Sequence, residues 1–418
     1  MICRVLSLVF PLLCASAFAE ETAALSPGHL RLAADYSRGH GGLSLLVLKD
    51  GARVFEEYHN GHRAEDGYAL ASGTKSFVGV LAMQAVEDGL IGLEERVSDT
   101  LHEWRSDPRK AIITVRQLLD LSSGLDPAKE LLQGSEVKDK YARAISLEAT
   151  ARPGQRFRYG PGHYYAFGAF LARKLAAQKT PESFEGYLKR RLLAPLGIEP
   201  RFWQKDAAGS LALPAGAVLT ARSWARFGEM IRRGGVGPQG RVVQARSLSA
   251  CFRPSAAKVN YGLTFWLLGT KPQAVKNRAQ GSGFPRDAVM AAGKGKQRCY
   301  VIRSAGLTIV RQGVRTTPAF SDGEFFGRLL FGRAKAVTVA KRQPAILAVG
   351  GRAKVAAQHA RLDRDGDGLL ERPDLPAVPA RAWERSDLDG DGGIDVHELV
   401  LLSIGRASDA ARTGGLGR

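Results

Sequence analysis

Two β-rich runs joined by an Asp-Gly pair constrain the kind of sheet that this chain can form. In "LSLLVLKDGARVFEEYH" (43–59), Asp50-Gly51 separates two runs rich in apolar and β-branched residues. An Asp-Gly pair between such runs favours a two-residue hairpin turn, because both positions tolerate positive φ. The sequence therefore predicts a β-hairpin near the start of the folded part of the chain.

The rest of the chain changes from helical to strand patterns in a definite order. Apolar residues recur at helical spacing over 74–88, and the stretches 113–125, 163–178 and 223–235 also predict helices. Strands are predicted at 261–269, 298–302 and 307–313, followed by a helix at 323–333. Strands at both ends and helices between them indicate an α+β domain, in which a mainly helical insertion splits the sheet.

The first 19 residues have the pattern of a secretory signal peptide. Arg4 is followed by an apolar run and by Ala17-Phe18-Ala19, which predicts cleavage after Ala19. Lipidation at Cys14 is disfavoured because the bulky Leu13 precedes it. No later segment has 18 unbroken apolar residues, so we expect no transmembrane span and an exported protein, periplasmic or extracellular.

The composition divides the remaining chain into a large domain and a small module. We expect the large domain at 20–333, a linker rich in Ala, Val, Lys, Arg and Gly at 334–357, the module at 358–404 and a flexible tail at 405–418. After signal removal only Cys251 and Cys299 remain. They form either one disulfide, which an oxidising compartment allows, or two buried thiols.

The formal net charge of +19 is unevenly distributed. Residues 363–398 contain eleven acidic residues against four arginines, a balance of −7, which leaves +26 on the rest of the chain. A basic body favours an anionic neighbour such as a cell-envelope polymer. The arginines are scattered and have no interleaved aromatic residues, so we expect no nucleic-acid binding. The oligomeric state is left open.

The pattern S-x-x-K occurs three times, at Ser72–Lys75, Ser135–Lys138 and Ser255–Lys258. Only Ser72 begins a long apolar helical pattern. Positions i and i+3 of a helix share a face, so the Lys75 amine can reach the Ser72 hydroxyl. A helix N-terminus also offers positive potential and free N–H groups to an oxyanion. The residues predict either an activated serine nucleophile or an ordinary helix N-cap at Ser72.

The order of motifs resembles the class C β-lactamase family, which includes penicillin-binding-protein-like esterases, peptidases and amide hydrolases. The resemblance rests on "ASGTKSFVGVLAMQAVEDGLIGLEERVSDTL" followed by "ITVRQLLDLSSGL", on "PGQRFRYGPGHYYAFGAFL" (153–171), and on "LTARSWARFGEMIRRGG" and "YGLTFWLL". It covers roughly residues 28–333. It implies a β-lactamase-like serine hydrolase fold, with an antiparallel sheet flanked by helices and a mainly helical subdomain.

The resemblance also implies a catalytic set that needs no cofactor. Ser72 would attack a carbonyl and form an acyl-enzyme, and Lys75 would move the serine proton. Tyr159, at the tyrosine of the family's Y-x-N motif, would act as general base and acid with Lys75. A cationic lysine beside a phenol favours the phenolate, which makes this role physically reasonable.

Two departures from the family pattern concern substrate recognition. The family's asparagine falls on Pro161, and the nearby His163 is better explained as a structural residue. The family's third motif falls on Ala291-Ala292-Gly293, or in a shifted alignment on Lys294-Gly295-Lys296. In either alignment the Lys294 N–H would share an oxyanion hole with the Ser72 N–H. We therefore expect an esterase, peptidase or amide hydrolase. The alternative is a catalytically silent protein that binds cell-wall peptide and attaches through calcium.

Two acidic 12-residue loops, 363–374 and 387–398, resemble an EF-hand pair. Alternating carboxylates and a central glycine fold around one calcium ion, which takes six to eight oxygens. The spacing predicts two Ca²⁺ sites with these ligands: Asp363, Asp365, Asp367, Leu369, Glu371 and Asp374 in the first loop, and Asp387, Asp389, Asp391, Gly393, Asp395 and Glu398 in the second. The first loop ends in the shorter Asp374, so we expect it to bind more weakly.

Overall fold

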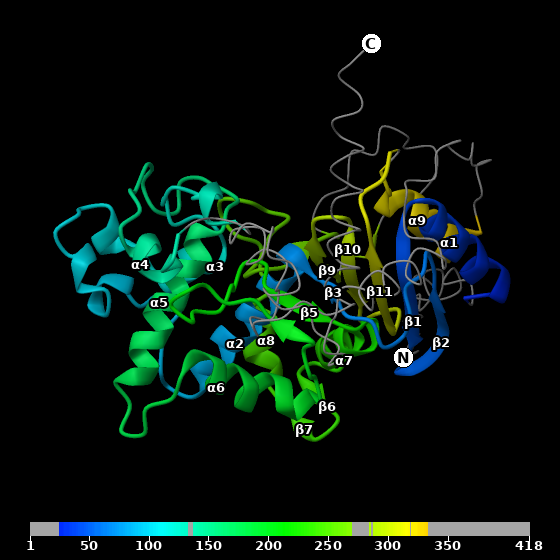
Figure 1. Ribbon diagram of the computed structural model, residues 1–418, viewed down its shortest axis with the longest axis horizontal. Helices are drawn as coiled ribbons and strands as arrows, with labels where there is room; N and C mark the ends of the chain where they lie inside the picture. The colour runs from blue at the N-terminus through cyan, green and yellow to red at the C-terminus, as the bar shows by residue number, and fades with distance from the viewer. Residues whose placement is uncertain (1–24, 133–136, 270–283, 286, 318, 333–418) are drawn as a thin grey trace, which may run out of the picture.

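A six-stranded antiparallel sheet forms the centre of the protein, with strand order β2-β1-β11-β10-β9-β8 (Figure 1). The computed structural model describes residues 25–132, 137–269, 284–285, 287–317 and 319–332. The strands are β1 (Gly42–Lys49), β2 (Ala52–Tyr58), β8 (Trp266–Leu267), β9 (Ala288–Gly293), β10 (Gln297–Ile302) and β11 (Leu307–Gly313). Two smaller sheets join β3 (Tyr68–Ala69), β5 (Ala217–Leu219) and β4 (Phe202–Trp203), and β6 (Val236–Gly237) with β7 (Gly240–Arg241).

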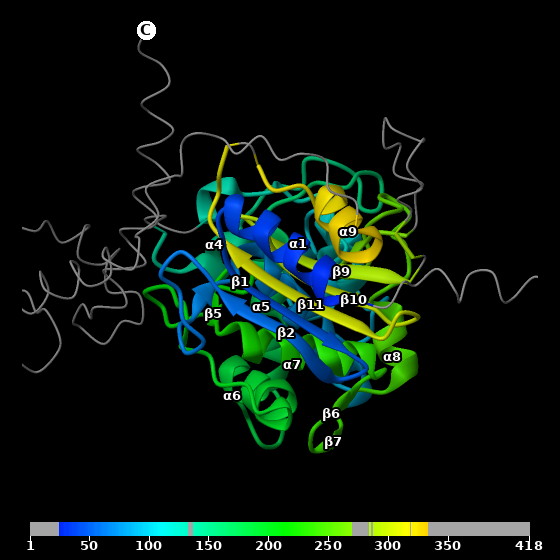
Figure 2. The ribbon, with the colours of Figure 1, turned by 90° about the vertical axis from the view of Figure 1, so that its right-hand side faces the viewer.

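Helices cover both faces of the central sheet. α1 (Pro27–Gly39) and α9 (Asp322–Phe331) pack together on one face, and α7 (Ala221–Arg232) packs on the other (Figures 1 and 2). α2 (Lys75–Glu87) packs against α7 through the stacked rings of Phe77 and Phe227, and against α8 (Ala245–Ala250) on another side. A helical region beyond them contains α3 (Val115–Leu119), α4 (Lys140–Ile145), α5 (Gly162–Ala176) and α6 (Phe184–Leu188). The expected α+β architecture, an antiparallel sheet with helices, is confirmed.

The two ends of the described chain meet in the middle of the sheet. β1 pairs with β11 from Gly42–Gly313 to Lys49–Leu307, so the first and last strands are neighbours (Figure 2). The predicted hairpin between β1 and β2 is confirmed, with φ of 52° at Asp50 and 88° at Gly51. The helical region is therefore an insertion between strands of one sheet, as the order of sequence patterns predicted.

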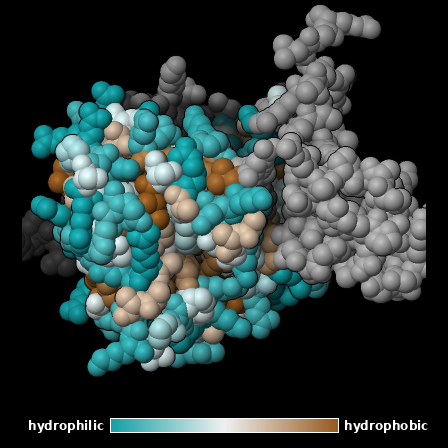
Figure 3. Space-filling model, turned by 60° about the vertical axis from the view of Figure 1, so that its left-hand side comes forward, coloured by the Kyte–Doolittle hydropathy of each residue, from teal (hydrophilic) through white to brown (hydrophobic). Residues whose placement is uncertain are grey.

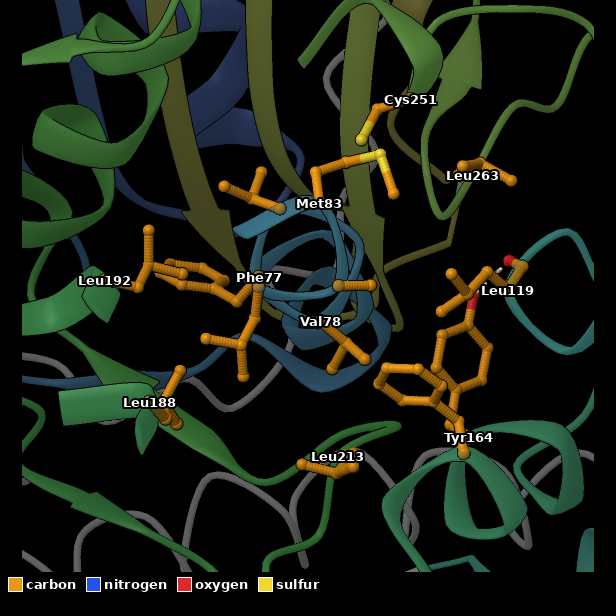
Figure 4. Close-up of a cluster of buried hydrophobic side chains, with 14 of the residues drawn as sticks. Phe77, Val78, Met83, Leu119, Tyr164, Leu188, Leu192, Leu213, Cys251 and Leu263 are labelled. Carbon is orange, nitrogen blue, oxygen red and sulfur yellow. Dashed lines mark hydrogen bonds between the residues drawn. The ribbon is translucent and has the colours of Figure 1, made fainter. Parts of the chain in front are cut away.

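The core has two parts, one on each face of the sheet. Along β1 the side chains alternate, so Leu45 and Val47 pack towards α1 and α9 while Leu46 packs on the opposite face. α2 crosses the larger core, and all its residues from 75 to 85 are buried (Figure 4). A helix that is apolar on every side requires such an interior position. The first residue of this buried helix is Lys75.

Two predicted elements are shorter than the sequence pattern suggested. The helix predicted over 113–125 is α3 alone, because the Asp120 carboxylate accepts hydrogen bonds from the Ser122 N–H and hydroxyl and Leu121 has a φ of 63°. The strand predicted over 261–269 is reduced to β8. There the Gly262 N–H donates to the Phe265 carbonyl, which turns the chain before the strand.

Of the two predictions for the cysteines, a disulfide or two buried thiols, the structure has the thiols. Cys251 and Cys299 are both free and buried, so a disulfide between them is wrong. Burial raises the pKa of both thiols, that of Cys251 to about 12. They are inert packing groups at neutral pH.

Hydrophilic residues cover most of the face drawn in Figure 3. None of the helices in the described ranges is both long and apolar enough to cross a membrane. The signal peptide, the linker, the acidic module and the tail lie outside the described residues.

Candidate active site

The Ser72 turn, which we define as Leu70–Thr74, is held tightly between β5 and α7. Ser72 lies in a single 3-10 turn (Ala71–Thr74) that continues directly into α2. The Ala217 backbone accepts from the Leu70 N–H at 2.9 Å and donates to Thr74 Oγ1 at 3.2 Å. Ala71 has a φ of 47°, a strained value for alanine that persists only where the surroundings enforce it.

Ser72 does not act as a helix N-cap. The N-terminal positions of the 3-10 turn and of α2 are Leu70 and Thr74, and neither makes a side-chain capping hydrogen bond. The N-cap alternative is therefore wrong, and the Ser72 hydroxyl is available for other contacts.

Lys75 contacts the Ser72 hydroxyl from inside the core. Its Nζ is hydrogen-bonded to Ser72 Oγ at 3.0 Å and donates to the Pro214 carbonyl at 2.7 Å. The side chain is only 2% exposed, and burial lowers the pKa of Lys75 to about 7. The amine lies over the rings of Tyr159 and Tyr164, 5.0 and 5.4 Å from their centroids. An amine with a pKa near 7 is partly neutral at neutral pH, and in its neutral form it can accept the serine proton.

Tyr159 is the third residue at this site, because its hydroxyl interacts with Ser72, which lowers the pKa of Tyr159. Burial of the hydroxyl raises the pKa of Tyr159, and the interaction with Ser72 only partly opposes this effect. The phenol therefore stays protonated at neutral pH. The expectation that a cationic Lys75 would favour a phenolate does not hold, because burial disfavours the charged form of both groups.

His163 fixes the loop that carries Tyr159. Its ring is fully buried, with Nδ1 2.8 Å from Ser123 Oγ and Nε2 2.9 Å from the Arg158 carbonyl. Burial lowers its pKa to about 4. One neutral tautomer satisfies both contacts, since Nε2–H donates to the carbonyl and Nδ1 accepts from the serine. The buried Pro161 is the residue before α5, and its carbonyl accepts hydrogen bonds from the first turn of that helix. Because proline has neither a side-chain amide nor a backbone N–H, it has no donor for a substrate.

The end of β9 lies directly against the Ser72 turn. A β-carbon at Gly293 would lie 2.0 Å from the Leu70 carbonyl oxygen, so only glycine fits there. Within the described ranges, the backbone N–H groups of Ser72 and Lys294 have no hydrogen-bond partner. Two such donors close together can stabilise an oxyanion. β9 ends at Gly293, and Lys294 is an exposed turn residue, which favours Ala291-Ala292-Gly293 as the segment at the third-motif position.

Two buried polar residues that sequence reasoning missed hold the turn after β9. Gln297 donates to the carbonyls of Lys294 and Gly313 at 3.1 and 2.5 Å and accepts from the Gly313 N–H at 3.0 Å. Arg311 donates to the Lys296 carbonyl at 2.9 Å and is fully buried, and burial lowers its pKa to about 10. In the sequence both look like ordinary polar positions in half-exposed strands, so no local signal identified them.

Of the other two S-x-x-K patterns, the described one, Ser255–Lys258, makes its contacts elsewhere. Ser255 is buried and donates to Asp120 at 2.9 Å, and its own carbonyl accepts from the Lys258 N–H. The buried Asp120 carboxyl, whose pKa burial raises, thereby links the helical region to the segment before β8. Ser135 lies outside the described residues, as do all the predicted calcium ligands at 363–398.

Aromatic side chains stand beside the nucleophile. Tyr159 stacks on Trp266 with ring centroids 6.1 Å apart, and Phe157 contacts both Trp266 and Tyr261. Phe157, Tyr159 and Trp266 remain partly exposed. This aromatic cluster gives the site an apolar side.

Comparison with known proteins is consistent with this arrangement. The family model described as Beta-lactamase matches residues 18–317. Protein flp of Staphylococcus aureus is 26% identical over 179 residues, which span 39% of this chain and only 35% of that relative. The crystal structure of a family VIII carboxylesterase is similar with a TM-score of 0.57 at 17% identity, covering 73% of this chain and 96% of that one. The crystal structure of a D-stereospecific amidohydrolase from Streptomyces sp. is similar with a TM-score of 0.54 at 17% identity. The match covers 73% of this chain and 99% of that one.

Proposed function

Because the chain belongs to the β-lactamase family of penicillin-binding-protein-like serine hydrolases, we propose that it cleaves an ester or amide through an acyl-enzyme on Ser72. The observation that carries the proposal is the 3.0 Å hydrogen bond between Ser72 Oγ and a Lys75 amine whose pKa is lowered by burial to about 7. A serine hydroxyl is a weak nucleophile unless such a base takes its proton.

The proposed acylation uses these groups in the following order. The Ser72 oxygen attacks the carbonyl carbon while its proton passes to Lys75. The negative charge that develops on the carbonyl oxygen is stabilised by the N–H groups of Ser72 and Lys294. The protonated Tyr159 phenol then gives its proton to the leaving alkoxide or amine, and Lys75 returns a proton to Tyr159. Water attacks the acyl-enzyme by the reverse route and releases the acid.

The recognition groups favour an uncharged acyl group. Pro161 cannot hydrogen-bond a substrate amide, and the segment at the third-motif position, Ala291-Ala292-Gly293, has no cation for a carboxylate. The aromatic cluster of Phe157, Tyr159 and Trp266 offers apolar contact instead. We therefore propose short, apolar esters as the best substrates, with amides next and carboxylate-bearing β-lactams poor.

A serine-directed fluorophosphonate followed by peptide mapping tests the nucleophile. The adduct should lie on Ser72 and disappear in Ser72→Ala, whereas Ser135→Ala, which removes another S-x-x-K serine, should label fully. A panel of esters, amides and lactams monitored by intact mass then ranks the substrates. If no probe forms an adduct, a catalytically silent peptide-binding protein is the better description of the chain. Cephalosporin turnover as fast as ester turnover would refute the substrate assignment.

The acidic module is a separate proposal about the same chain. The donor set of 363–398, carboxylates at alternate positions around a glycine, fits the oxygen chemistry of Ca²⁺. We propose that 358–404 binds two calcium ions and that the mature chain is exported after loss of residues 1–19. Calcium there would organise the module and take no part in acyl transfer.

A further inference from the structure

Tyr164, in the first turn of α5, is a fully buried residue whose ring faces the Lys75 amine. The ring centroid lies 5.4 Å from Lys75 Nζ, which is within the range of cation–π attraction. The Tyr159 ring lies 5.0 Å from the same atom, so two aromatic faces contact one amine. The acylation scheme proposed above uses Tyr159 but gives no role to Tyr164.

Two hydrogen bonds hold the Tyr164 ring in place. Its hydroxyl donates to the Leu119 carbonyl at 3.1 Å, and Figure 4 shows it directed at that residue. The Tyr261 hydroxyl lies 3.1 Å from the Tyr164 hydroxyl. A phenol has a single proton to donate, so Tyr261 is the donor in this second bond. Burial raises the pKa of both phenols, so both stay protonated at neutral pH. The ring is therefore tied to the end of α3 and to the segment before β8.

No anionic side chain of the described chain offsets a charge on Lys75. Its amine contacts a hydroxyl and a backbone carbonyl, and no carboxylate lies within ion-pair distance. The buried Asp120 carboxyl is bonded instead to Ser122 and Ser255. His163 is also fully buried, and burial lowers its pKa to about 4, so it is neutral at neutral pH. The groups left to stabilise an ammonium ion are the backbone carbonyl and the two aromatic rings.

The proposed acylation creates an ammonium ion at this point. When Lys75 takes the Ser72 proton it becomes a cation inside the core, where burial disfavours charge. An aromatic face attracts a cation, and does so more strongly away from water, but has little attraction for a neutral amine. The Tyr164 ring therefore stabilises the state after proton transfer more than the state before it, which is the condition for speeding the step.

We propose that Tyr164 is a positioning residue for acyl transfer, whose ring stabilises the ammonium form of Lys75 and keeps the amine directed at Ser72. This inference rests on the proposed function, in which Lys75 is the base. Tyr164 acts through Lys75 and, unlike Tyr159, transfers no proton.

The pH dependence of Ser72 labelling by a fluorophosphonate tests this role. The rate in the wild type should rise with a midpoint near pH 7, where Lys75 loses its proton. Tyr164→Leu removes the ring but keeps an apolar side chain. It should lower the midpoint by about one pH unit and the rate at high pH about tenfold, because the ammonium form loses its aromatic partner. Tyr164→Phe keeps the ring and should keep the wild-type midpoint.

Tyr165→Leu is the matched control. Tyr165 is the next residue of α5 and is also buried, but its ring faces Lys140. This variant should keep the wild-type midpoint. An unchanged midpoint in Tyr164→Leu, or an equal shift in Tyr164→Phe or Tyr165→Leu, overturns the role of Tyr164 while leaving Ser72 as the nucleophile. If the wild type is not labelled at all, the proposed function fails, and the role of Tyr164 fails with it.

Denaturant unfolding across the same pH range gives a readout that does not depend on activity. The free energy of unfolding should begin to rise near pH 7 in the wild type and at a lower pH in Tyr164→Leu, since folded Lys75 then loses its proton earlier. Tyr164→Phe and Tyr165→Leu should keep the wild-type onset. Tyr164→Met, whose flexible side chain fills irregular space, serves if Tyr164→Leu fails to fold. An onset that does not move when the ring is removed contradicts the proposal.

Discussion

At the scale of single residues, the chemistry depends on a lysine that folding makes a poor cation. Lys75 is buried at the start of α2, where its amine contacts the Pro214 carbonyl and the Ser72 hydroxyl. It has no carboxylate partner among the described residues. Burial therefore disfavours its charged form, and the molecule gives up stability to hold a free base beside Ser72.

Lys75→Met removes the buried amine, so it should slow acylation while relieving the loss of stability that burial of the amine causes. Acylation should fall by ~10²-fold or more, the usual scale for loss of a general base. In the wild type, the rate of acylation should rise with pH through about 7, where the amine loses its proton. Esterase pH profiles check this, and a rate independent of pH between 6 and 8 would count against Lys75 as the base.

The same substitution changes the pH dependence of stability. Above about pH 7 and below the ordinary lysine pKa of 10.5, the unfolded chain holds a proton on Lys75 that the folded chain lacks. Stability from this group therefore rises with pH across that window, by up to about 1.4 kcal/mol per pH unit. Denaturant unfolding at pH 7 and 9 should show this slope in the wild type and a smaller one in Lys75→Met. Parallel slopes would contradict the lowered pKa.

Gln297 is a positioning residue for the Lys294 amide. Gln297→Glu keeps an acceptor for the Gly313 N–H but loses the donor to the Lys294 carbonyl. The turn should loosen, so we expect kcat to fall about tenfold with little change in KM, a fraction of what loss of an oxyanion donor costs. Steady-state kinetics at a temperature well below the melting transition measures both. A variant that only melts earlier, with kcat intact, would make Gln297 purely structural.

At the scale of elements, the site depends on how closely β9 approaches the Ser72 turn. Gly293→Ala would place a methyl group 2.0 Å from the Leu70 carbonyl oxygen, a backbone atom that cannot move cheaply. The end of β9 should be pushed away from Ser72, lowering both acylation and thermal stability.

Gly327→Ala provides the matched control for that change. Gly327 lies inside α9, and a β-carbon there would meet nothing within 4 Å in the described structure. Alanine in a helix interior is favoured over glycine by about 0.5–1 kcal/mol, so this variant should be slightly more stable and fully active. If Gly293→Ala behaves like Gly327→Ala in both assays, the close approach does not matter for catalysis.

At the scale of the whole molecule, the hydrolase domain and the acidic module should respond differently to calcium. The described domain has its own core on both faces of the sheet. In our proposal the crowded carboxylates of 363–398 repel one another until calcium binds, so the binding energy there would be folding energy. Chelation should leave esterase activity unchanged while making 358–404 sensitive to limited proteolysis.

Glu398→Gln tests which loop binds first. The second loop ends in Glu398, which reaches an ion in two-oxygen mode better than Asp374 does, so it should be the tighter site. Titration should show the stronger of two calcium sites weakened in Glu398→Gln, with Asp374→Asn affecting the weaker one. Unchanged calcium affinity in Glu398→Gln would exclude the predicted ligand set.

Features that depend on neighbouring residues could be predicted from the sequence. The Asp50-Gly51 turn, the buried helix after Ser72 and the strands at 298–302 and 307–313 follow from local spacing and turn chemistry, and the structure has them. The match of the chain to its family likewise rests on motifs that lie in order along the sequence. The pairing of Ser72 with Lys75 was visible because a helical turn brings the two together.

Features that depend on contacts between distant segments could be seen only in the folded structure. The lowered pKa of Lys75, the raised pKa of Tyr159 and the closeness of Gly293 to Leu70 all arise from burial and packing between residues far apart in the chain. Gln297, Arg311 and His163 acquire their roles in the same way, through carbonyls and hydroxyls that the fold brings to them. Spacing along a sequence does not encode such contacts, because desolvation and hydrogen bonding depend on which surfaces meet after folding.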